Sequence, residues 1–374
     1  MRNRTRTGLT GIAVTSLAIV TTLALAAPAA GYTSAHGSGG TKDPITVIAS
    51  GLNGPRQLTD GRGWRGEPIY VAESDSGQVT RIDRRTGGTT PVVTGVGEGL
   101  LQGVAVVGDR FALATGGAED LPPEAAAIAM SLLVAKPGKP ATRLADLLAY
   151  ELTNNPDGQD QSVDTVSNPY YVLDDRRWGG YALVADAGAN VVLAVDRRGR
   201  VKTFFLPPTI TTGACAEVEN NTASGVGCDA VPTGLAYGPG NTLYVSALTS
   251  EVPGEGRVYV VDARTGKLRK TISGFSGPTG VAVDPAGNVF VSELLEGFPA
   301  GDGPPPDDFD PSTVGQIVKV TPSGKRSFAQ VTMPSGLLWD DGSLYASAWS
   351  VAGFLGMGDA GQVVSIAPGA FVKG

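Results

Sequence analysis

Histidine is nearly absent from this 374-residue chain, which contains a single one, His36, in a polar segment rich in glycine and serine. Histidine is the usual general base at neutral pH and an essential member of Ser-His-Asp sites. Its shortage therefore argues against serine-hydrolase chemistry. We expect His36 itself to be a flexible, solvated side chain.

Cysteine is also scarce. The two residues, Cys215 and Cys228, lie thirteen positions apart in the segment CAEVENNTASGVGC. A structural zinc site needs four ligands, and no histidine lies near this pair. In an exported protein two neighbouring cysteines most simply form a disulfide, which here would pin a surface loop. Free or catalytic thiols are the alternative.

Basic residues are outnumbered, with 29 Lys and Arg against 36 Asp and Glu and a formal charge of −7. An acidic chain without a basic stripe repels phosphate backbones, so we expect no nucleic-acid partner. Charged residues make up only 17% of the chain, whereas it contains 53 glycines and 26 prolines. This composition favours a turn-rich all-β protein.

Long apolar runs are missing after residue 30. Before it, three arginines precede an apolar run over residues 9–27 and the small residues of an A-x-A cleavage pattern. We therefore predict a signal peptide over 1–30, a flexible segment over 31–44 and a secreted, monomeric mature protein with no membrane span. A retained membrane anchor is the alternative. Cleavage would move the formal charge to about −10.

One pattern recurs along residues 45–368: a turn and strand of the form P-x-G-[VL], a second β-rich strand, and a third strand that ends in Asp or Thr. The clearest copies are VPTGLAYGPGNTLYVSAL, GPTGVAVDPAGNVFVSEL and MPSGLLWDDGSLYASAW, at 231–248, 277–294 and 333–349. Three weaker copies precede them. Radial repetition covers the edges of four-stranded sheets, so the sequence predicts a six-bladed β-propeller.

A fourth strand follows each of the first five copies, whereas the sixth, TVIASGL (46–52), stands at the other end of the chain. We predict that it completes the last blade, and that residues 369–374 form a tail. A seven-bladed propeller with one degenerate copy and a pair of β-sandwiches are the alternatives. Insertions are expected on the loop faces, where repeat proteins usually bind, at 116–130, 149–167, 208–230 and 297–313.

Two stretches resemble the ScyD/ScyE family, which is encoded with scytonemin biosynthesis and related to NHL-repeat propellers. VIASGLNGPRQLT with IYVAESDSGQVTRID resembles the family's first blade, and NNPDGQDQSVDTVSNPYYVL with VADAGANVVLAVD resembles its NPDG…SNPYGV…VADAGAN signature. The similarity covers essentially residues 45–368; Tyr171 departs from it, since the family usually has Gly there, as do the insertions 208–230 and 297–313. The resemblance implies an exported propeller but no established reaction.

The site residues of known enzymatic propellers can be compared with the residues of this chain. Streptogramin-lyase-like and quinone-dependent sugar dehydrogenase propellers use histidines, and the predicted propeller, residues 45–368, contains none. Six-bladed propellers of the gluconolactonase/regucalcin class hold a divalent metal through acidic and Asn ligands near the start of the innermost strands. At these positions the six copies have Arg56, Gln102, Tyr170, Thr233, Thr279 and Ser335. None of these residues is a carboxylate, whereas hard cations need several charged oxygens.

A second ring is acidic on alternate blades. At the end of the second strand, blades one, three and five carry Glu73, Asp186 and Glu293. One hypothesis is a cation or polar-ligand site, with Ca²⁺ as the cofactor, at one mouth of the channel. The other is that each carboxylate caps backbone N–H groups within its own blade.

A third candidate is the loop 154–168, where Asp157, Asp160 and Asp164 are further candidate Ca²⁺ ligands. The EF-hand spacing is absent from this loop. A loop ordered by Asx-type turns is the alternative interpretation.

These observations predict a secreted binding or scaffold module that presents a loop face to a small molecule, glycan or protein. The competing prediction is a metal-dependent, lactonase-like hydrolase built on the carboxylate ring. A purely structural stalk is a third hypothesis.

Overall fold

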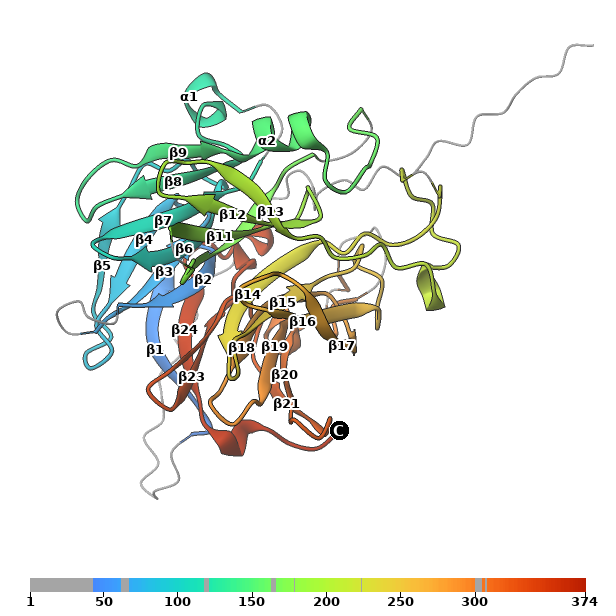
Figure 1. Ribbon diagram of the computed structural model, residues 1–374. Coiled ribbons are helices and arrows are strands. Elements are labelled where there is room, and N and C mark those ends of the chain that lie inside the picture. The colour runs from blue at the N-terminus through green and yellow to red at the C-terminus, as the bar shows by residue number, and fades with distance from the viewer. Residues whose placement is uncertain are drawn as a thin grey trace, which may run out of the picture.

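The computed structural model describes residues 43–374 except 62–66, 118–120, 163–165, 178, 223, 300–304 and 307. The predicted signal peptide 1–30 and His36 lie outside the described residues. Within the described part the strands form six four-stranded antiparallel sheets, each a blade of a propeller (Figure 1). The six-bladed prediction is confirmed.

Five blades use four consecutive strands each. Blade 1 has β2 (Pro55–Asp60), β3 (Ile69–Glu73), β4 (Gln78–Ile82) and β5 (Thr89–Val93). Blade 2 has β6 (Leu101–Val107), β7 (Arg110–Thr115), β8 (Ser131–Ala135) and β9 (Thr142–Asp146). Blade 3 has β10 (Pro169–Asp174), β11 (Gly180–Asp186), β12 (Val191–Asp196) and β13 (Val201–Phe205). Blade 4 has β14 (Pro232–Gly238), β15 (Thr242–Ala247), β16 (Gly256–Asp262) and β17 (Leu268–Phe275). Blade 5 has β18 (Pro278–Val283), β19 (Val289–Glu293), β20 (Gln316–Val320) and β21 (Arg326–Gln330).

Blade 6 closes the ring with strands from both ends of the chain. It consists of β22 (Leu337–Asp340), β23 (Ser343–Ala348), β24 (Gly361–Ile366) and β1 (Ile45–Leu52). β1 pairs antiparallel with β24 from Ile45 opposite Ile366 to Leu52 opposite Gly361. The main-chain ladder therefore joins the two ends, as the position of the closing strand predicts.

The blades pack through the faces of their middle strands. All five residues of β3 and of β19 are buried, because neighbouring blades cover both faces of each sheet. One cluster joins Ala112 and Leu132 of blade 2 to Val184 of blade 3. The outer strand β17, by contrast, exposes most of its residues. Burial thus falls from the middle of each blade toward its rim.

The described residues of the four long insertions lie on one face of the ring. Strands alternate in direction within a blade, so second-to-third-strand connections and blade-to-blade connections emerge on the same side. We call this side the loop face. It carries α1 (Pro123–Ala126), α2 (Leu147–Asn154), η1 (Gly213–Cys215), η2 (Pro311–Thr313) and η3 (Ala352–Leu355). No helix in the described part of the chain has the length and apolar character needed to cross a membrane.

The C-terminal residues dock against blade 5. After η4 (Pro368–Ala370), Val372 and Phe328 of β21 exchange backbone hydrogen bonds at 2.8 and 2.9 Å. Phe371 packs beside Phe290 with ring centroids 5.6 Å apart. The tail predicted over 369–374 therefore covers part of the outer edge of that blade.

Candidate functional site

The two glutamates of the predicted acidic ring cap backbone N–H groups. Glu73 and Glu293 are buried at the loop-face ends of β3 and β19. Glu73 accepts from the N–H of Asn53 at 2.6 Å, and Glu293 accepts from the N–H of Ser276 at 2.7 Å. The other oxygen of each carboxylate accepts from the glutamine that begins β4 or β20, at 3.0 and 2.6 Å. Both carboxylates thus hold the segment that enters their own blade.

Asp186 performs the same function in blade 3 with a shorter side chain. One oxygen accepts from the N–H groups of Asn168 and Ala189 at 2.6 and 3.2 Å, and the other accepts from the Ser167 hydroxyl at 2.7 Å. The glutamates reach an N–H two residues before the proline that begins their inner strand. Asp186 is one methylene shorter and reaches the N–H immediately before that proline. The contacts of all three residues match the capping interpretation.

Burial changes how Asp186 and Glu293 titrate. Desolvation raises the pKa of Asp186 to about 6, although its hydrogen bonds act in the opposite direction. Desolvation also raises the pKa of Glu293, whose bonds to Ser276 and Gln316 oppose the shift. A carboxyl group with a pKa near neutrality can act as a general acid. Asp186 is fully buried, however, so no substrate atom reaches it in this arrangement.

The structure does not gather the acidic ring into one cluster. Among the described residues, no three side chains of Asp, Glu, His or Cys come together in a way that could hold a metal ion. Glu73, Asp186 and Glu293 each remain within the entry segment of their own blade.

The residues aligned near the start of the innermost strands, which we call the inner ring, lie at a bulge repeated in five inner strands. In β6, β10, β14 and β18 the register shifts by one residue at the second strand position, and in β2 the shift spans Arg56 and Gln57. A bulge redirects the extra side chain and bends the strand. The extra residues are the ones aligned in the sequence, namely Arg56, Gln102, Tyr170, Thr233 and Thr279.

Most of these side chains form hydrogen bonds between blades. Thr233 donates to the carbonyl of Pro278 at 2.7 Å, and Gln102 donates to the hydroxyl of Ser74 at 3.2 Å. The hydroxyls of Tyr170 and Ser335 lie 3.3 Å apart. Because blades 3 and 6 are opposite each other in a six-membered ring, this last bond crosses the axis. The ring is thus neutral apart from Arg56, and it does not fit a hard divalent cation.

One level deeper, two large side chains fill the axis. Gln57 donates to the carbonyl of Val172 at 2.6 Å and accepts from the N–H groups of Val172 and Val104 at 2.9 and 3.2 Å. The hydroxyl of Tyr171 points to the carbonyl of Leu337 on the opposite blade, at 3.5 Å. Tyr171, the residue at which the sequence departs from the ScyD/ScyE pattern, thus reaches across the axis. Sequence comparison did not single out Gln57.

Glycine occupies the same level in the other four blades because the inner strands approach closely there. A Cβ at Gly280 would lie 2.2 Å from the backbone oxygen of Ser335, and one at Gly336 would lie 2.4 Å from that of Arg56. Gly103 and Gly234 are similarly confined. Four glycines and two large side chains therefore close the channel.

Arg56 is the charged member of the inner ring. It is 8% exposed, and its Nε has no hydrogen-bond partner. Its positive charge opposes the burial that raises the pKa of Asp75. The guanidinium thus places a positive charge in the inner ring, where it would repel a cation.

The predicted Ca²⁺ ligands of the loop 154–168 lie in different surroundings. Asp160 is exposed and accepts from the N–H and hydroxyl of Ser162 at 3.0 and 2.7 Å, an Asx-type turn. Asp164 lies outside the described residues. Asp157 accepts from the N–H of Gln159 at 3.2 Å and from the side-chain amide of Asn190 at 3.0 Å. It lines a cavity of about 150 Å³ together with Gln159, Asn190 and Asp229.

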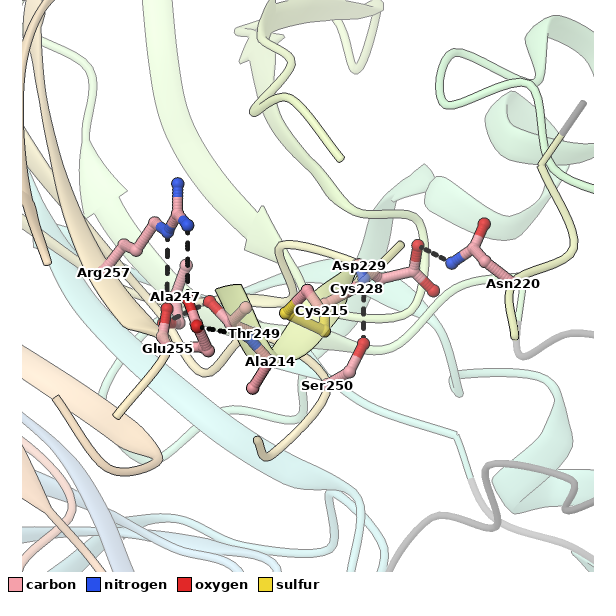
Figure 2. The surroundings of a disulfide bond; sticks show 10 residues. All are labelled: Ala214, Cys215, Asn220, Cys228, Asp229, Ala247, Thr249, Ser250, Glu255 and Arg257. Atoms are coloured by element: carbon pink, nitrogen blue, oxygen red, sulfur yellow. Dashed lines mark hydrogen bonds and ion pairs between the residues drawn. A yellow bond between two sulfur atoms is a disulfide. The ribbon is translucent and has the colours of Figure 1, made fainter. Parts of the chain in front are cut away.

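The predicted disulfide joins Cys215 and Cys228, whose sulfurs lie 2.06 Å apart (Figure 2). Both cysteines are fully buried beneath their loop with Ile210. The adjacent Asp229 accepts from the amide of Asn220 at 2.7 Å, and its N–H donates to the Ser250 hydroxyl at 2.8 Å. Sequence reasoning missed Asp229 as a cavity residue, and its position beside a disulfide cysteine was the available signal.

Comparison with solved structures shows the fold alone. The chain is similar to a gluconolactonase from Xanthomonas campestris, at 13% identity and a TM-score of 0.52 over 87% of this chain and 89% of the other. It is also similar to a calcium-binding regucalcin from Agrobacterium tumefaciens, at 13% identity and a TM-score of 0.51 over 88% and 94%. A PQQ-bound aldose sugar dehydrogenase from Streptomyces coelicolor follows at 12% identity and a TM-score of 0.51 over 86% and 97%. No protein-family model and no curated protein sequence matches the chain.

Proposed function

We propose that the chain is a secreted, ScyD/ScyE-like binding propeller that acts through its loop face. The observation that carries this proposal is the contrast between the central axis of the ring and its loop face. The axis is closed by Gln57 and Tyr171 and lined by groups engaged in bonds between blades. The loop face carries every long insertion and the disulfide.

A protein partner is supported by the apolar side chains on this face. Met and aromatic residues are enriched in the cores of protein interfaces. Phe354 and Met357 of the β23–β24 connection are 58% and 38% exposed. Leu295 in the β19–β20 connection and Val226 in the disulfide loop are also exposed on this face.

The test compares two apolar-to-charged substitutions. Phe354→Glu changes the loop face, whereas the matched control Leu268→Glu changes an exposed residue of the outer strand β17. A partner from the secreted fraction of the source cells should bind the wild type and the control but not Phe354→Glu. Equal loss of binding in both variants, or equal retention in both, would refute a loop-face site.

A lactonase-like hydrolase is the second candidate. It is favoured by the fold likeness to a gluconolactonase and by the raised pKa of Asp186, about 6, but it requires the segment that enters blade 3 to move, because Asp186 is fully buried. Lactone hydrolysis should be measured with and without added divalent metals. Turnover that disappears in Asp186→Asn or Glu293→Gln would establish this function and overturn the proposal above.

A further inference from the structure

A second cavity, of about 360 Å³, lies between blades 2 and 3 on the face of the ring opposite the loop face. Val107, Val134 and Leu144 form its apolar wall, and two exposed arginines, Arg110 and Arg197, also line it. Small-molecule sites have volumes of about 300–1,000 Å³ and combine a mostly apolar lining with a few charged groups. The cavity therefore has the size and the composition of a ligand site.

Blade 2 lacks the aromatic side chain that other blades direct toward their neighbour at this level. In four blades the residue three positions before the end of the second strand is aromatic and packs against the following blade; these residues are Tyr70, Tyr244, Phe290 and Tyr345. Blade 3 has Leu183 at this position, and blade 2 has Ala112, which faces blade 3. The smallest of the six side chains thus stands at the junction that contains the cavity.

The junction of blades 6 and 1 shows what an arginine contacts when the aromatic residue is present. The sequence Asp-Arg-Arg begins the turn between the third and fourth strands at 83–85 in blade 1 and again at 196–198 in blade 3. In blade 1 the guanidinium of Arg84 lies over the ring of Tyr345 at 5.4 Å and pairs with Asp340 at 2.5 Å, both in the preceding blade. This arginine therefore has an aromatic face and a carboxylate.

In blade 3 the corresponding arginine, Arg197, finds neither partner. Ala112 stands in place of the tyrosine. Val107 stands in place of the aspartate, because each lies two residues beyond the strand partner of the position just named. The Arg197 side chain makes no ion pair or hydrogen bond with another described residue. Burial raises the pKa of Asp174, and Arg176 opposes this shift more strongly than Arg197 does, so that carboxyl group has another cation.

The remaining polar groups of the cavity also lack an acceptor. Asp109 lies 2.8 Å from Lys136 but 3.8 Å from Arg110, so the lysine balances its charge. Tyr181 is 9% exposed, and its hydroxyl has no hydrogen-bond partner among the described residues. Desolvation raises the pKa of Tyr181 to about 12, so the hydroxyl stays a donor near neutral pH. Buried polar groups are nearly always satisfied, which points to an acceptor that the chain does not supply.

We propose that this cavity binds a small aromatic carboxylate. The ring and the carboxylate of the ligand replace the tyrosine and the aspartate that the equivalent arginine contacts at the junction of blades 6 and 1, and Arg197 is their partner. Guanidinium groups stack on aromatic faces and bind carboxylates through two parallel hydrogen bonds. The site lies on the face opposite Phe354 and does not rest on the proposed partner binding.

The experiment measures binding of naphthoate to the purified protein by saturation-transfer NMR, with naphthalenemethanol as the uncharged analogue. We expect saturable binding of naphthoate with a dissociation constant on the order of 0.1–1 mM, as is usual for a ligand of this size. The alcohol should bind at least about tenfold more weakly, and Arg197→Gln should weaken naphthoate binding by about the same factor, since hydrogen bonds between charged groups are lost. The matched control Arg198→Gln removes the same charge from the next residue of the turn, which does not line the cavity, and should bind like the wild type.

A second variant supplies the missing carboxylate from the protein itself. Val107→Asp should abolish naphthoate binding, because the introduced carboxylate pairs with Arg197. Arg197→Gln changes an exposed residue and keeps the test decisive if Val107→Asp folds poorly.

Five results would overturn the proposal. They are no saturable binding up to about 10 mM naphthoate, equal affinity for the alcohol, equal loss of binding in Arg197→Gln and Arg198→Gln, unchanged binding in both Arg197→Gln and Val107→Asp, and loss of binding in Phe354→Glu, which would place the ligand on the loop face.

Discussion

The buried carboxyl group of Asp186 predicts an unusual pH dependence of stability. Its pKa rises from 3.8 to about 6 on folding because burial disfavours the charged form. A group whose pKa is raised in the folded state contributes stability that is present at low pH and lost as the pH rises through the folded value. Each pKa unit corresponds to about 1.4 kcal/mol, so ionisation of Asp186 lowers the free energy of unfolding by about 3 kcal/mol between about pH 3 and pH 8.

Asp186→Asn removes this cost without removing the cap. Asn keeps an oxygen for the N–H groups of Asn168 and Ala189, and its amide can donate to the Ser167 hydroxyl. The variant should match the wild type near pH 3 and exceed its stability by up to about 3 kcal/mol at pH 8. Urea unfolding of both proteins across this range measures the difference.

Two controls sharpen the test. Asp160→Asn changes a carboxyl group whose pKa is lowered by its bonds to Ser162, so the stability advantage of the wild type over this variant should shrink as the pH falls. Asp186→Ala strands the capped N–H groups, at about 1–3 kcal/mol per group, and should destabilise the protein most at low pH, where the wild-type carboxyl group is neutral and carries no ionisation cost. A difference between Asp186→Asn and the wild type that does not change with pH would refute the reasoning.

Three further predictions concern the architecture. Replacing Cys215 and Cys228 with Ser removes a cross-link between residues thirteen positions apart and should lower the free energy of unfolding by up to about 3 kcal/mol. Proteolysis should then begin within 208–230 while the circular dichroism of the blades is retained. Unchanged proteolysis would contradict this prediction. Gly280→Ala forces a Cβ to within 2.2 Å of the Ser335 oxygen and should lower stability by more than about 3 kcal/mol, whereas Gly369→Ala meets nothing within 4 Å and should be neutral in the same unfolding assay. Deletion of residues 45–52 exposes the edge of β24 and should cause association visible by size-exclusion chromatography; a stable monomer would show that the closing strand is dispensable.

The ring could be predicted from the sequence because the same strand pattern occurs in every blade. Six copies of one strand pattern, and a fourth strand missing from the last copy, lead directly to the pairing of β1 with β24. The position aligned at Thr233 and Thr279 is likewise the bulged position in both strands. A feature that recurs in each blade can be located by comparing the blades with one another.

Features that occur once were harder to predict. The closure of the axis depends on where Gln57 and Tyr171 point across the ring, and no repeat unit contains that information. The cavity joins Asp157 to Asp229, 72 positions later in the chain, through loops whose path follows no repeat. The caps of Glu73 and Glu293 could be stated only as an alternative, since strand-end carboxylates serve either as caps or as ligands.

The pairing of β1 with β24 also determines the order in which the protein can fold. Ile45 pairs with Ile366, which lies 321 positions later in the chain, so the entropic cost of closing this loop is large, on the order of 5 kcal/mol. During synthesis β1 emerges from the ribosome before any other strand of the propeller, but its partner β24 emerges after all the others. Cooperative folding of the closed ring therefore requires β24, and chains interrupted before residue 361 will expose the unpaired edge of β1 to neighbouring molecules.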